Sequence, residues 1–384
     1  MGAIHIHRQS VTSSGENGTP EVMDEILSSE LREEDDFWIS PARCHHEAIN
    51  VTIIIPSYQA ATTLHRAIDS VQKQTIHEIE IIVVDDGSTD SSWHIVSDLL
   101  RTEPRLRAMR NKGNRGKSVA LNRAVPFAQG RWLAILDADD WYHPERLATL
   151  AAQAEKLGAD MIADNQFLFD AAAETVVGPA WSMGQTIWKL TFDSYLRGSD
   201  AYDNFNLGML KPIIRTEFVR ATGLSYDERA RYSEDFIYLL QFFLLNGKAV
   251  VSDTPHYFYT QPFGTVSHRS SNAARKRYNF QMAYDINQTY LSKNAGSLTP
   301  FQSSNLRARG RRLISLEGYF CTKELLEHGQ WGKALIWTVQ HPAMLGYAAH
   351  RLFNRCITRS TAAATERVAR ESRYRSRAAS DTHK

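Results

Sequence analysis

Three carboxylates follow an apolar run in the stretch LAILDADDW, residues 133–141. The run is typical of a buried strand, and Asp137, Asp139 and Asp140 come directly after it. Carboxylates at this spacing raise one another's pKa unless a cation lies among them. Aspartate oxygens suit Mg²⁺ or Mn²⁺, which bind one or two carboxylates together with substrate phosphates. We therefore expect Asp137 and Asp139, on one side of an extended backbone, to hold a divalent ion, whereas Asp140 fits a cap or turn equally well.

Two more polar clusters follow apolar runs. Pro56, Ser57 and Tyr58 end the run VTIIIP, and Asp85 and Asp86 end the run EIIVVDD. Ligands of open α/β sheets bind beyond the carboxyl ends of the strands, so the three clusters should meet at one rim. The two aspartates could accept hydrogen bonds from a ribose or a base, or could simply cap the turn that follows.

The stretch NKGNRGKS does not form a phosphate loop, because GxxxxGK[ST] requires glycine where Asn111 stands. Asn114, Arg115 and Gly116 still precede a predicted helix, so backbone N–H groups, Arg115 or Lys117 could meet a phosphate. A solvated loop is the alternative.

Glu234 and Asp235 begin an otherwise apolar helical stretch, YSEDFIYLLQFF. They are general-base candidates, although acidic residues also favour a helix N-terminus through the dipole alone. His268 could be a metal ligand or a phosphate contact, but a lone histidine in a loop usually is neither.

Short apolar runs alternate with helix-like segments from residue 51 to residue 169, and this pattern predicts an α/β fold. Continuous rather than alternating apolar runs indicate a mostly parallel sheet covered on both faces. Strands are expected at 51–56, 80–86, 106–110, 131–137 and 160–169, and helices at 61–73, 90–101, 116–128 and 144–157. Residues 170–268 are less regular, and residues 270–350 are expected to be helical.

Composition narrows the class of protein. The chain has 384 residues, 43% hydrophobic residues and a formal charge of +1, so its bulk charge does not favour nucleic acid as a partner. Three scattered cysteines give no disulfide framework and no zinc spacing, which fits the cytoplasm. We expect no signal peptide and no membrane-spanning segment.

Four regions are expected. They are an acidic disordered leader (1–45), an α/β domain (46–268), a helical C-terminal region (269–356) and a basic flexible tail (357–384). The apolar stretch 341–355, with its arginines and the tail behind it, could lie on an anionic membrane surface, or it could pack on the core with its arginines exposed.

The motifs of residues 51–170 resemble, in order and spacing, those of the inverting family 2 glycosyltransferases with a GT-A fold. They are VTIIIPSYQAATTLHRAIDSVQKQT, EIIVVDDGSTDSS, GNRGKSVALNRAV and GRWLAILDADDWYHPERL. The resemblance implies a nucleotide-diphospho-sugar transferase fold, with a mostly parallel central sheet between helices, followed here by a helical C-terminal extension.

The same resemblance implies roles for the candidate residues. Residues implied to line the donor pocket are Pro56, Ser57, Tyr58, Asp85, Asp86, Asn114, Arg115, Lys117 and, toward the ribose, Asp137. Asp139 matches the metal ligand of the DxD motif, and His268 is a looser match to a second ligand. Glu234 and Asp235 match the acidic pair that supplies the catalytic base.

The implied reaction transfers a sugar from a UDP-sugar to an acceptor hydroxyl, with Mn²⁺ or Mg²⁺ as the cofactor. The expected sugar is glucose, and the expected acceptor is a glycan or lipid-linked oligosaccharide in bacterial exopolysaccharide synthesis of the succinoglycan type. Such acceptors place the enzyme at the inner face of the cytoplasmic membrane. The alternatives are a metal-dependent sugar-phosphate nucleotidyltransferase and a catalytically dead nucleotide-sugar binding module.

Overall fold

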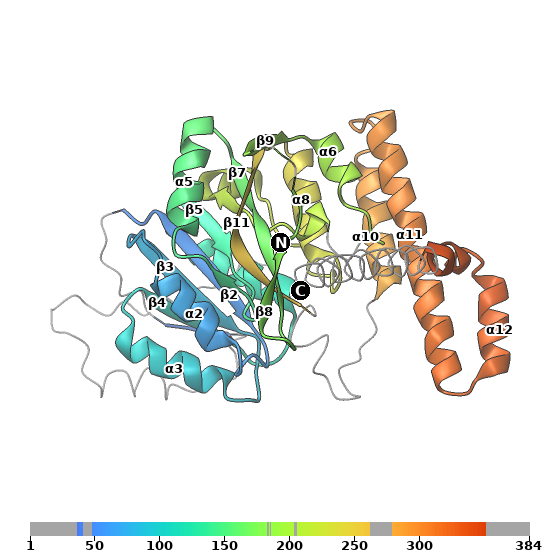
Figure 1. Cartoon of the computed structure of the whole chain (residues 1–384), viewed down its shortest axis with the longest axis horizontal. Coiled ribbons are helices and arrows are strands. Elements are labelled where there is room, and N and C mark those ends of the chain that lie inside the picture. Colours follow the sequence, from blue (N-terminus) through green and yellow to red (C-terminus); the bar gives the residue numbers. More distant parts are fainter. Residues whose placement is uncertain are drawn as a thin grey trace, which may run out of the picture.

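A mixed sheet lies between layers of helices in the computed structural model (Figure 1). The structure describes residues 37–40, 48–182, 184, 186–202, 206–261 and 279–350. The sheet order is β1-β4-β3-β2-β5-β10-β7-β11-β6, with β8 paired to β7 and β9 paired to β11.

Four neighbouring strands form the parallel core that the sequence predicts. They are β2 (Val51–Ser57), β3 (Ile79–Asp85), β4 (Leu106–Asn111) and β5 (Trp132–Ile135). Successive side chains of a strand point to opposite faces, and Ile53 and Ile54 are both fully buried in different core clusters. The continuous apolar runs therefore reflect a sheet that is covered on both sides.

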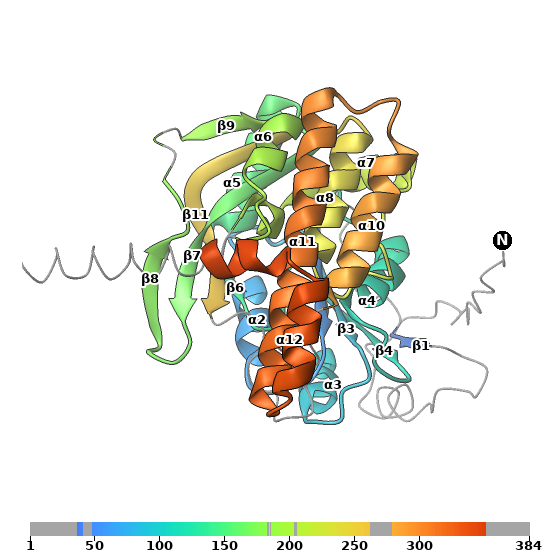
Figure 2. The same ribbon diagram turned by 90° about the vertical axis from the view of Figure 1, so that its right-hand side faces the viewer.

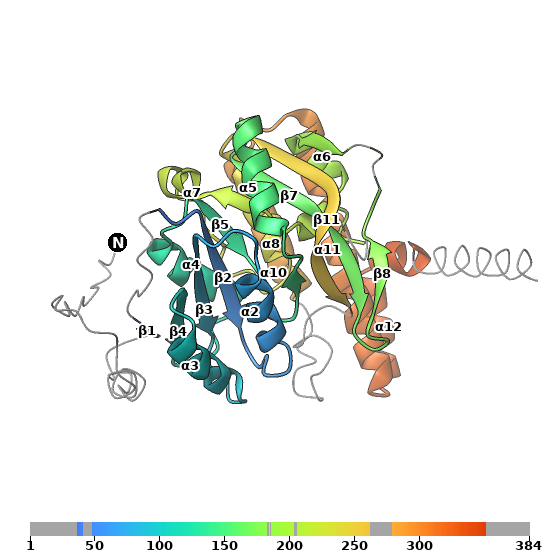
Figure 3. The same cartoon turned by 60° about the vertical axis from the view of Figure 1, so that its left-hand side comes forward.

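Helices from the predicted alternation cover the two faces. On one face α2 (Leu64–Gln72), α3 (Ser92–Thr102) and α5 (Arg146–Leu157) share a core cluster with the strands, and Figure 3 shows α2 and α3 beside β2, β3 and β4. The other face is packed by α4 (Lys117–Ala124) and α8 (Glu234–Leu244). The β–α connections thus run along the same rim.

The second half of the sheet is more ordered than the sequence indicates. The expected irregularity of residues 170–268 is wrong for the described part of this region, which contains several further strands and helices. They are the end of β7 (Met161–Asp170), β8 (Thr175–Pro179), β9 (Ile187–Leu190), α6 (Phe192–Arg197), η2 (Leu207–Met209), β10 (Ile213–Arg215), α7 (Thr216–Thr222), α8 and β11 (Ala249–Gln261). The inserted strand β10 runs antiparallel to both β5 and β7, and the two-residue strand β6 (Trp141–Tyr142) runs antiparallel to β11.

Helices follow the sheet in the described residues 279–350, which lie within the region 270–350 predicted to be helical. α10 (Phe280–Lys293) and α11 (Pro300–Glu327) lie side by side next to α8 (Figure 2). α12 (Trp331–Gln340) turns back along α11. Thr299 caps α11 through the Gln302 N–H, and Pro300 occupies a position where a helix does not use its N–H.

Short elements complete the described chain. A 3₁₀ turn, η1 (Val125–Phe127), follows α4. Strand β1 (Phe37–Ile39) pairs with β4, so the expectation of a disordered leader over 1–45 is wrong for these three residues. Among the described residues, none of the helices is both long enough and apolar enough to cross a bilayer.

Candidate active site

The polar residues at the carboxyl ends of the parallel strands lie along one rim of the sheet, as the sequence predicts. Ser57 of β2 lies opposite Asp85 of β3 in the ladder. The Asp86 N–H donates to the Ser57 carbonyl at 2.8 Å, which joins the two strand ends. Pro56 and Tyr58 at this rim are half-buried.

Asp85 is fully buried and has one unsatisfied oxygen. Its Oδ2 accepts from the Ser88 N–H at 3.2 Å and pairs with Arg110 Nε at 3.3 Å. Within the described part of the chain, neither its Oδ1 nor the buried Ser57 Oγ has a hydrogen-bond partner. Burial raises the pKa of Asp85, although hydrogen bonds from Ser88 and the charge of Arg110 oppose the effect. Two neighbouring polar atoms thus remain available to a ligand.

Asp86 holds the loop that precedes α4. Its carboxylate accepts from Asn111 Nδ2 at 2.7 Å, from the Arg115 N–H at 2.9 Å and from the Gly116 N–H at 2.6 Å. At Gly87 the φ angle is +74°, and any side chain would strike the backbone of this loop. The N–H groups of Arg115 and Gly116, expected to face a phosphate, are therefore used within the protein, while the side chains of Arg115 and Asn114 are exposed.

The counter-ions of Asp137 are two lysines. Lys117 Nζ lies 2.9 Å from its Oδ1, and Lys211 Nζ lies 2.7 Å from its Oδ2. Burial alone would raise the pKa of Asp137, but the two ammonium groups outweigh it and lower that pKa. The argument that the carboxylates need a metal cation is therefore wrong for Asp137.

The backbone around Asp137 is a turn rather than an extended segment. β5 ends at Ile135, and the Asp140 N–H donates to the Asp137 carbonyl at 3.0 Å. The extended geometry that the sequence predicts for Asp137 and Asp139 is thus wrong. The turn lets successive carboxylates take different partners.

Asp140 has the structural role that the sequence left open. Its Oδ2 accepts from the Tyr257 hydroxyl at 2.7 Å, and its Oδ1 accepts from the Thr260 N–H at 2.8 Å. These bonds attach the aspartate turn to β11. Burial, together with the charges of Asp139 and Asp137, raises the pKa of Asp140 well above its ordinary value.

Asp139 is the carboxylate of the turn that best suits a divalent ion. Burial and the neighbouring charge of Asp137 raise its pKa, and the two lysines oppose this effect less strongly. Its backbone carbonyl accepts from Arg66, whose guanidinium lies 3.8 Å from the ring centre of Trp141. A hard cation beside this carboxylate would stabilise its charge, so the donor chemistry fits Mn²⁺ or Mg²⁺. His268 lies outside the described residues.

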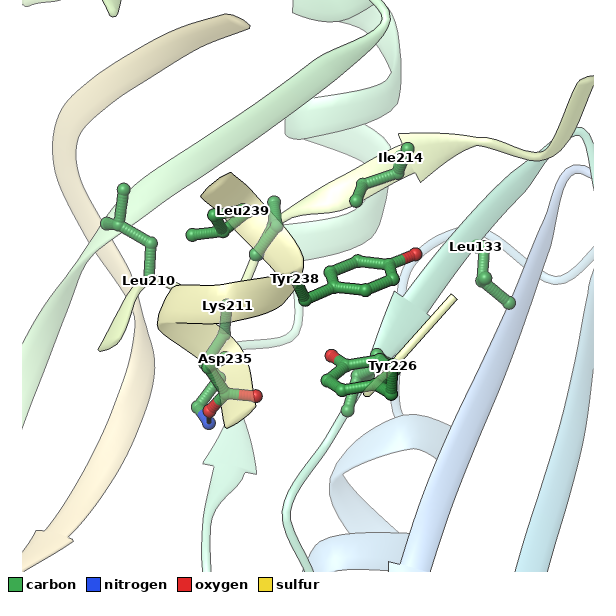
Figure 4. A pocket seen from close by; sticks show the side chains of 10 residues that line it. Leu133, Leu210, Lys211, Ile214, Tyr226, Asp235, Tyr238 and Leu239 are labelled. Carbon is green, nitrogen blue, oxygen red and sulfur yellow. Dashed lines mark hydrogen bonds and ion pairs between the residues drawn. The ribbon is translucent and has the colours of Figure 1, made fainter. Parts of the chain in front are cut away.

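The acidic pair of α8 reaches the same two lysines. Lys117 Nζ lies 3.5 Å from Glu234 Oε1 and 3.3 Å from Asp235 Oδ2, and Lys211 Nζ also contacts Asp235 Oδ2. Figure 4 shows Asp235 and Lys211 at one end of a small cavity whose other walls are mainly apolar. The two acidic motifs, nearly 100 residues apart, thus form one cluster around two cations.

Lys211 is a site residue that sequence reasoning missed. Its side chain is only 4% exposed, and its carbonyl accepts from the Arg146 guanidinium, which also binds Asp164 at 2.7 Å. A lysine within the apolar run MLKPII was the available signal, because a buried lysine requires an acidic partner.

Arg309 is a second residue that sequence reasoning missed. From α11 its guanidinium donates to the Ser233 hydroxyl at 2.8 Å and to the Ser199 carbonyl at 2.9 Å. It also lies 3.5 Å from the ring centre of Phe236. Ser233, with φ of 60°, directly precedes Asp235's helical turn, so the C-terminal helices fix the start of α8.

This combination of a parallel core, an inserted antiparallel strand and a carboxylate rim defines the GT-A class of α/β fold. Residues 52–190 match the model of Glycosyl transferase family 2, and this segment is a family 2 glycosyltransferase domain. The solved S. aureus TarS 1–349, in complex with UDP-GlcNAc, is similar over 74% of this chain and 79% of that chain, with TM-score 0.57 and 23% identity.

Two curated relatives come from Rhizobium meliloti (strain 1021). Succinoglycan biosynthesis protein ExoO is 30% identical over 57% of this chain and 62% of its own length. Succinoglycan biosynthesis protein ExoU is 34% identical over 49% of this chain and 55% of its own length. The chain therefore spans less than two thirds of either relative.

Proposed function

We propose that the protein is an inverting glycosyltransferase that moves a sugar, with glucose as the first candidate, from a UDP-sugar to an acceptor hydroxyl. The observation that carries this proposal is the convergence of Asp137 from the sheet rim and Asp235 from α8 on Lys117 and Lys211. Donor-binding and proton-accepting carboxylates must lie close together in such a reaction, and the two motifs do so here.

The donor nucleotide would enter at the ends of β2 and β3. Asp85 Oδ1 and Ser57 Oγ, both buried and unsatisfied among the described residues, suit the donor groups of a uracil and a ribose. Pro56 and Tyr58 flank this position, and Asn114 and Arg115 lie on the loop that Asp86 holds. The similarity to a structure with bound UDP-GlcNAc supports a UDP-linked donor.

Asp235 would accept the proton of the acceptor hydroxyl as that oxygen attacks the anomeric carbon from the face opposite the nucleotide. Lys117 and Lys211 keep the Asp235 carboxylate next to the donor site, and Glu234 lies beside it on the first turn of α8. Mn²⁺ or Mg²⁺ bound at Asp139, with His268 as a second candidate ligand, would stabilise the charge on the departing diphosphate.

The acceptor would be a lipid-linked oligosaccharide in exopolysaccharide synthesis, and the similarity to two succinoglycan biosynthesis proteins supports this choice. An enzyme for such an acceptor works at the inner face of the cytoplasmic membrane. We place the membrane contact on the C-terminal region: α12 exposes Trp331, Leu335 and Val339 along one side, and residues 351–384 carry nine basic against three acidic residues.

UDP release from UDP-glucose tests the reaction. With Mn²⁺ and an extract of lipid-linked oligosaccharides, the wild-type protein should release UDP and extend the acceptor, and Asp139→Ala should lose most of this turnover. A nucleotidyltransferase would instead consume a nucleoside triphosphate and release pyrophosphate. A binding module would take up the donor without releasing UDP.

A further inference from the structure

Two histidines and a glutamate meet at the connection between β6 and α5, on side chains that the proposed reaction does not use. Ligand atoms of His143, Glu145 and His256 all lie within 4.8 Å of one another. His256 is only 8% exposed, and its Nδ1 is buried with no hydrogen-bond partner in the described part of the chain. A buried imidazole nitrogen without a partner is rare and requires a ligand or another explanation.

The backbone holds these three residues in place. The His143 N–H donates to the His256 carbonyl at 2.7 Å, so the two residues stay side by side. The His143 carbonyl accepts from Gln74 Nε2 at 2.9 Å and from the Arg146 N–H at 3.0 Å. Glu145 occupies the N-cap position of α5, two residues from His143. These bonds keep the three side chains near one another, with ligand atoms within 4.8 Å.

The local charge balance allows a cation. Arg146 is a positive charge that acts on His256, and its Nε and Nη2 atoms both donate to Asp164, at 3.0 and 2.7 Å. The buried Arg146–Asp164 pair is neutral overall. The carboxylate of Glu145 therefore provides the negative charge that would attract a cation.

We propose that His143, Glu145 and His256 form a zinc site separate from the donor-binding site. Two imidazoles and one carboxylate are a ligand set typical of Zn²⁺, with a water molecule in the fourth position. Mn²⁺ and Mg²⁺ prefer carboxylate oxygen, which the site around Asp139 supplies. The inference stands independently of the proposed transfer reaction.

Zinc at this position would connect the β6–α5 turn to β11. β11 also supplies Tyr257 and Thr260, which hold Asp140 in the aspartate turn. An ion bound by the folded chain alone stabilises it by mass action, so Zn²⁺ should raise the melting temperature. The site would thus support the geometry of the donor site from the opposite end of β6.

Calorimetric titration of the full chain, without an affinity tag, with ZnCl₂ tests the proposal. The titration is run in the Asp139→Ala background, which removes the proposed donor-site ligand, and is followed by thermal denaturation with and without Zn²⁺. We expect uptake of one Zn²⁺ and a higher melting temperature. Adding His143→Ala or Glu145→Gln should weaken Zn²⁺ binding by at least about tenfold and remove the thermal shift.

The matched control is the double variant His45→Ala/His46→Ala, which removes an adjacent histidine pair elsewhere in the sequence. It should leave the affinity and the thermal shift unchanged. His143 is only half-buried and Glu145 is exposed, so neither substitution should prevent folding. Equal Zn²⁺ affinity in the His143→Ala and parent proteins, or loss of binding in the control alone, would overturn the proposal, whatever the result for UDP release.

Discussion

Lys117 and Lys211 are the residues that make an acidic cluster of this density stable. Each ammonium group contacts both Asp137 and Asp235, so the two lysines together neutralise carboxylates from two separate sequence motifs. Burial alone would lower the pKa of both lysines, but the surrounding carboxylates, Asp137 first, raise it instead. Both lysines therefore stay charged, and they hold the candidate base Asp235 next to Asp137 of the proposed donor site.

Lys211→Met should destabilise the protein, because it leaves two largely buried carboxylates with one cation fewer. Removing one partner of a buried ion pair costs about 3 kcal/mol, so the free energy of unfolding in urea should fall by about that amount. Lys189→Met is the control: this lysine is exposed on β9, and its loss should change stability by less than about 0.5 kcal/mol. A Lys211→Met protein as stable as the wild type would show that the ion pairs contribute nothing.

Asp235→Asn should keep donor binding and lose transfer. A general base contributes about 10²–10⁴-fold to a rate, so kcat for UDP release with acceptor should fall within that range. Glu234→Gln, one residue away, should have a much smaller effect. If Asp235→Asn weakened UDP-glucose affinity as much as it lowered turnover, Asp235 would belong to the donor pocket and not to proton abstraction.

The aspartates could be recognised from the sequence, but their partners could not. Asp85, Asp137 and Asp139 stand at the ends of apolar runs, and this position alone predicts a shared rim. The apolar run MLKPII signals a buried Lys211, but no local pattern indicates the pairing of the short antiparallel strand β10 that follows it and brings it to the site. The role of Asp86 was not predictable either, since its three hydrogen bonds go to the end of β4 and to the loop after it, 25 or more residues away.

At the scale of elements, the helical C-terminal region supports α8, the helix that carries the proposed base. Arg309 of α11 donates a hydrogen bond to Ser233 at the start of α8. Ser233 adopts a left-handed backbone conformation, which is unfavourable for residues other than glycine. The hydrogen bond and the contact with Phe236 hold that strained turn in place. The geometry of Asp235 thus depends on a helix outside the α/β domain.

Arg309→Met should lower kcat by at least about tenfold while changing the KM for the donor much less, because it releases the start of α8 and misplaces the base. Steady-state UDP release gives both constants. Arg312→Met is the control on the same helix, since Arg312 is 40% exposed and pairs with Asp200 at 3.0 Å. Equal kcat values in the Arg309→Met and Arg312→Met proteins would show that Arg309 does not position Asp235.

The first half of the sheet could be predicted because its signals are local. A local run of residues predicts each of the parallel strands β2, β3, β4 and β5, and the helices α2, α3, α4 and α5 follow them in turn along the chain. The region after residue 170 contains short strands of three to five residues, β8, β9 and β10. Their register is set by pairing with β5, β7 and β11, and a single sequence does not reveal such long-range pairing.

At the scale of the whole molecule, the glycosyltransferase domain is followed by helices with an unusual exposed surface. Trp331, Leu335 and Val339 are 69%, 67% and 72% exposed at successive turns of α12. Figures 1 and 2 show α12 against α11 with its other side facing outward. An apolar helical side that is followed in the sequence by a basic segment is the pattern of a helix that lies in the interface of an anionic bilayer.

Replacing these three residues by serine should weaken binding to vesicles that contain phosphatidylglycerol, because the apolar area that enters the interface is lost. Sedimentation with vesicles measures the bound fraction, and UDP release with a soluble acceptor should stay close to the wild-type rate. The control is Val176→Ser/Val177→Ser, which removes exposed apolar residues from β8. Equal vesicle binding by the wild-type and α12 variant proteins would exclude α12 as the contact.

The measurement that tests the central claim most directly is calorimetry of UDP-glucose binding with and without Mn²⁺. The wild-type protein should bind the nucleotide sugar in the presence of Mn²⁺ and much more weakly without it, and Asp139→Ala should lose the dependence on Mn²⁺. No metal-dependent uptake of UDP-glucose or of any other nucleotide sugar would contradict the claim that these strand-end carboxylates form a donor site.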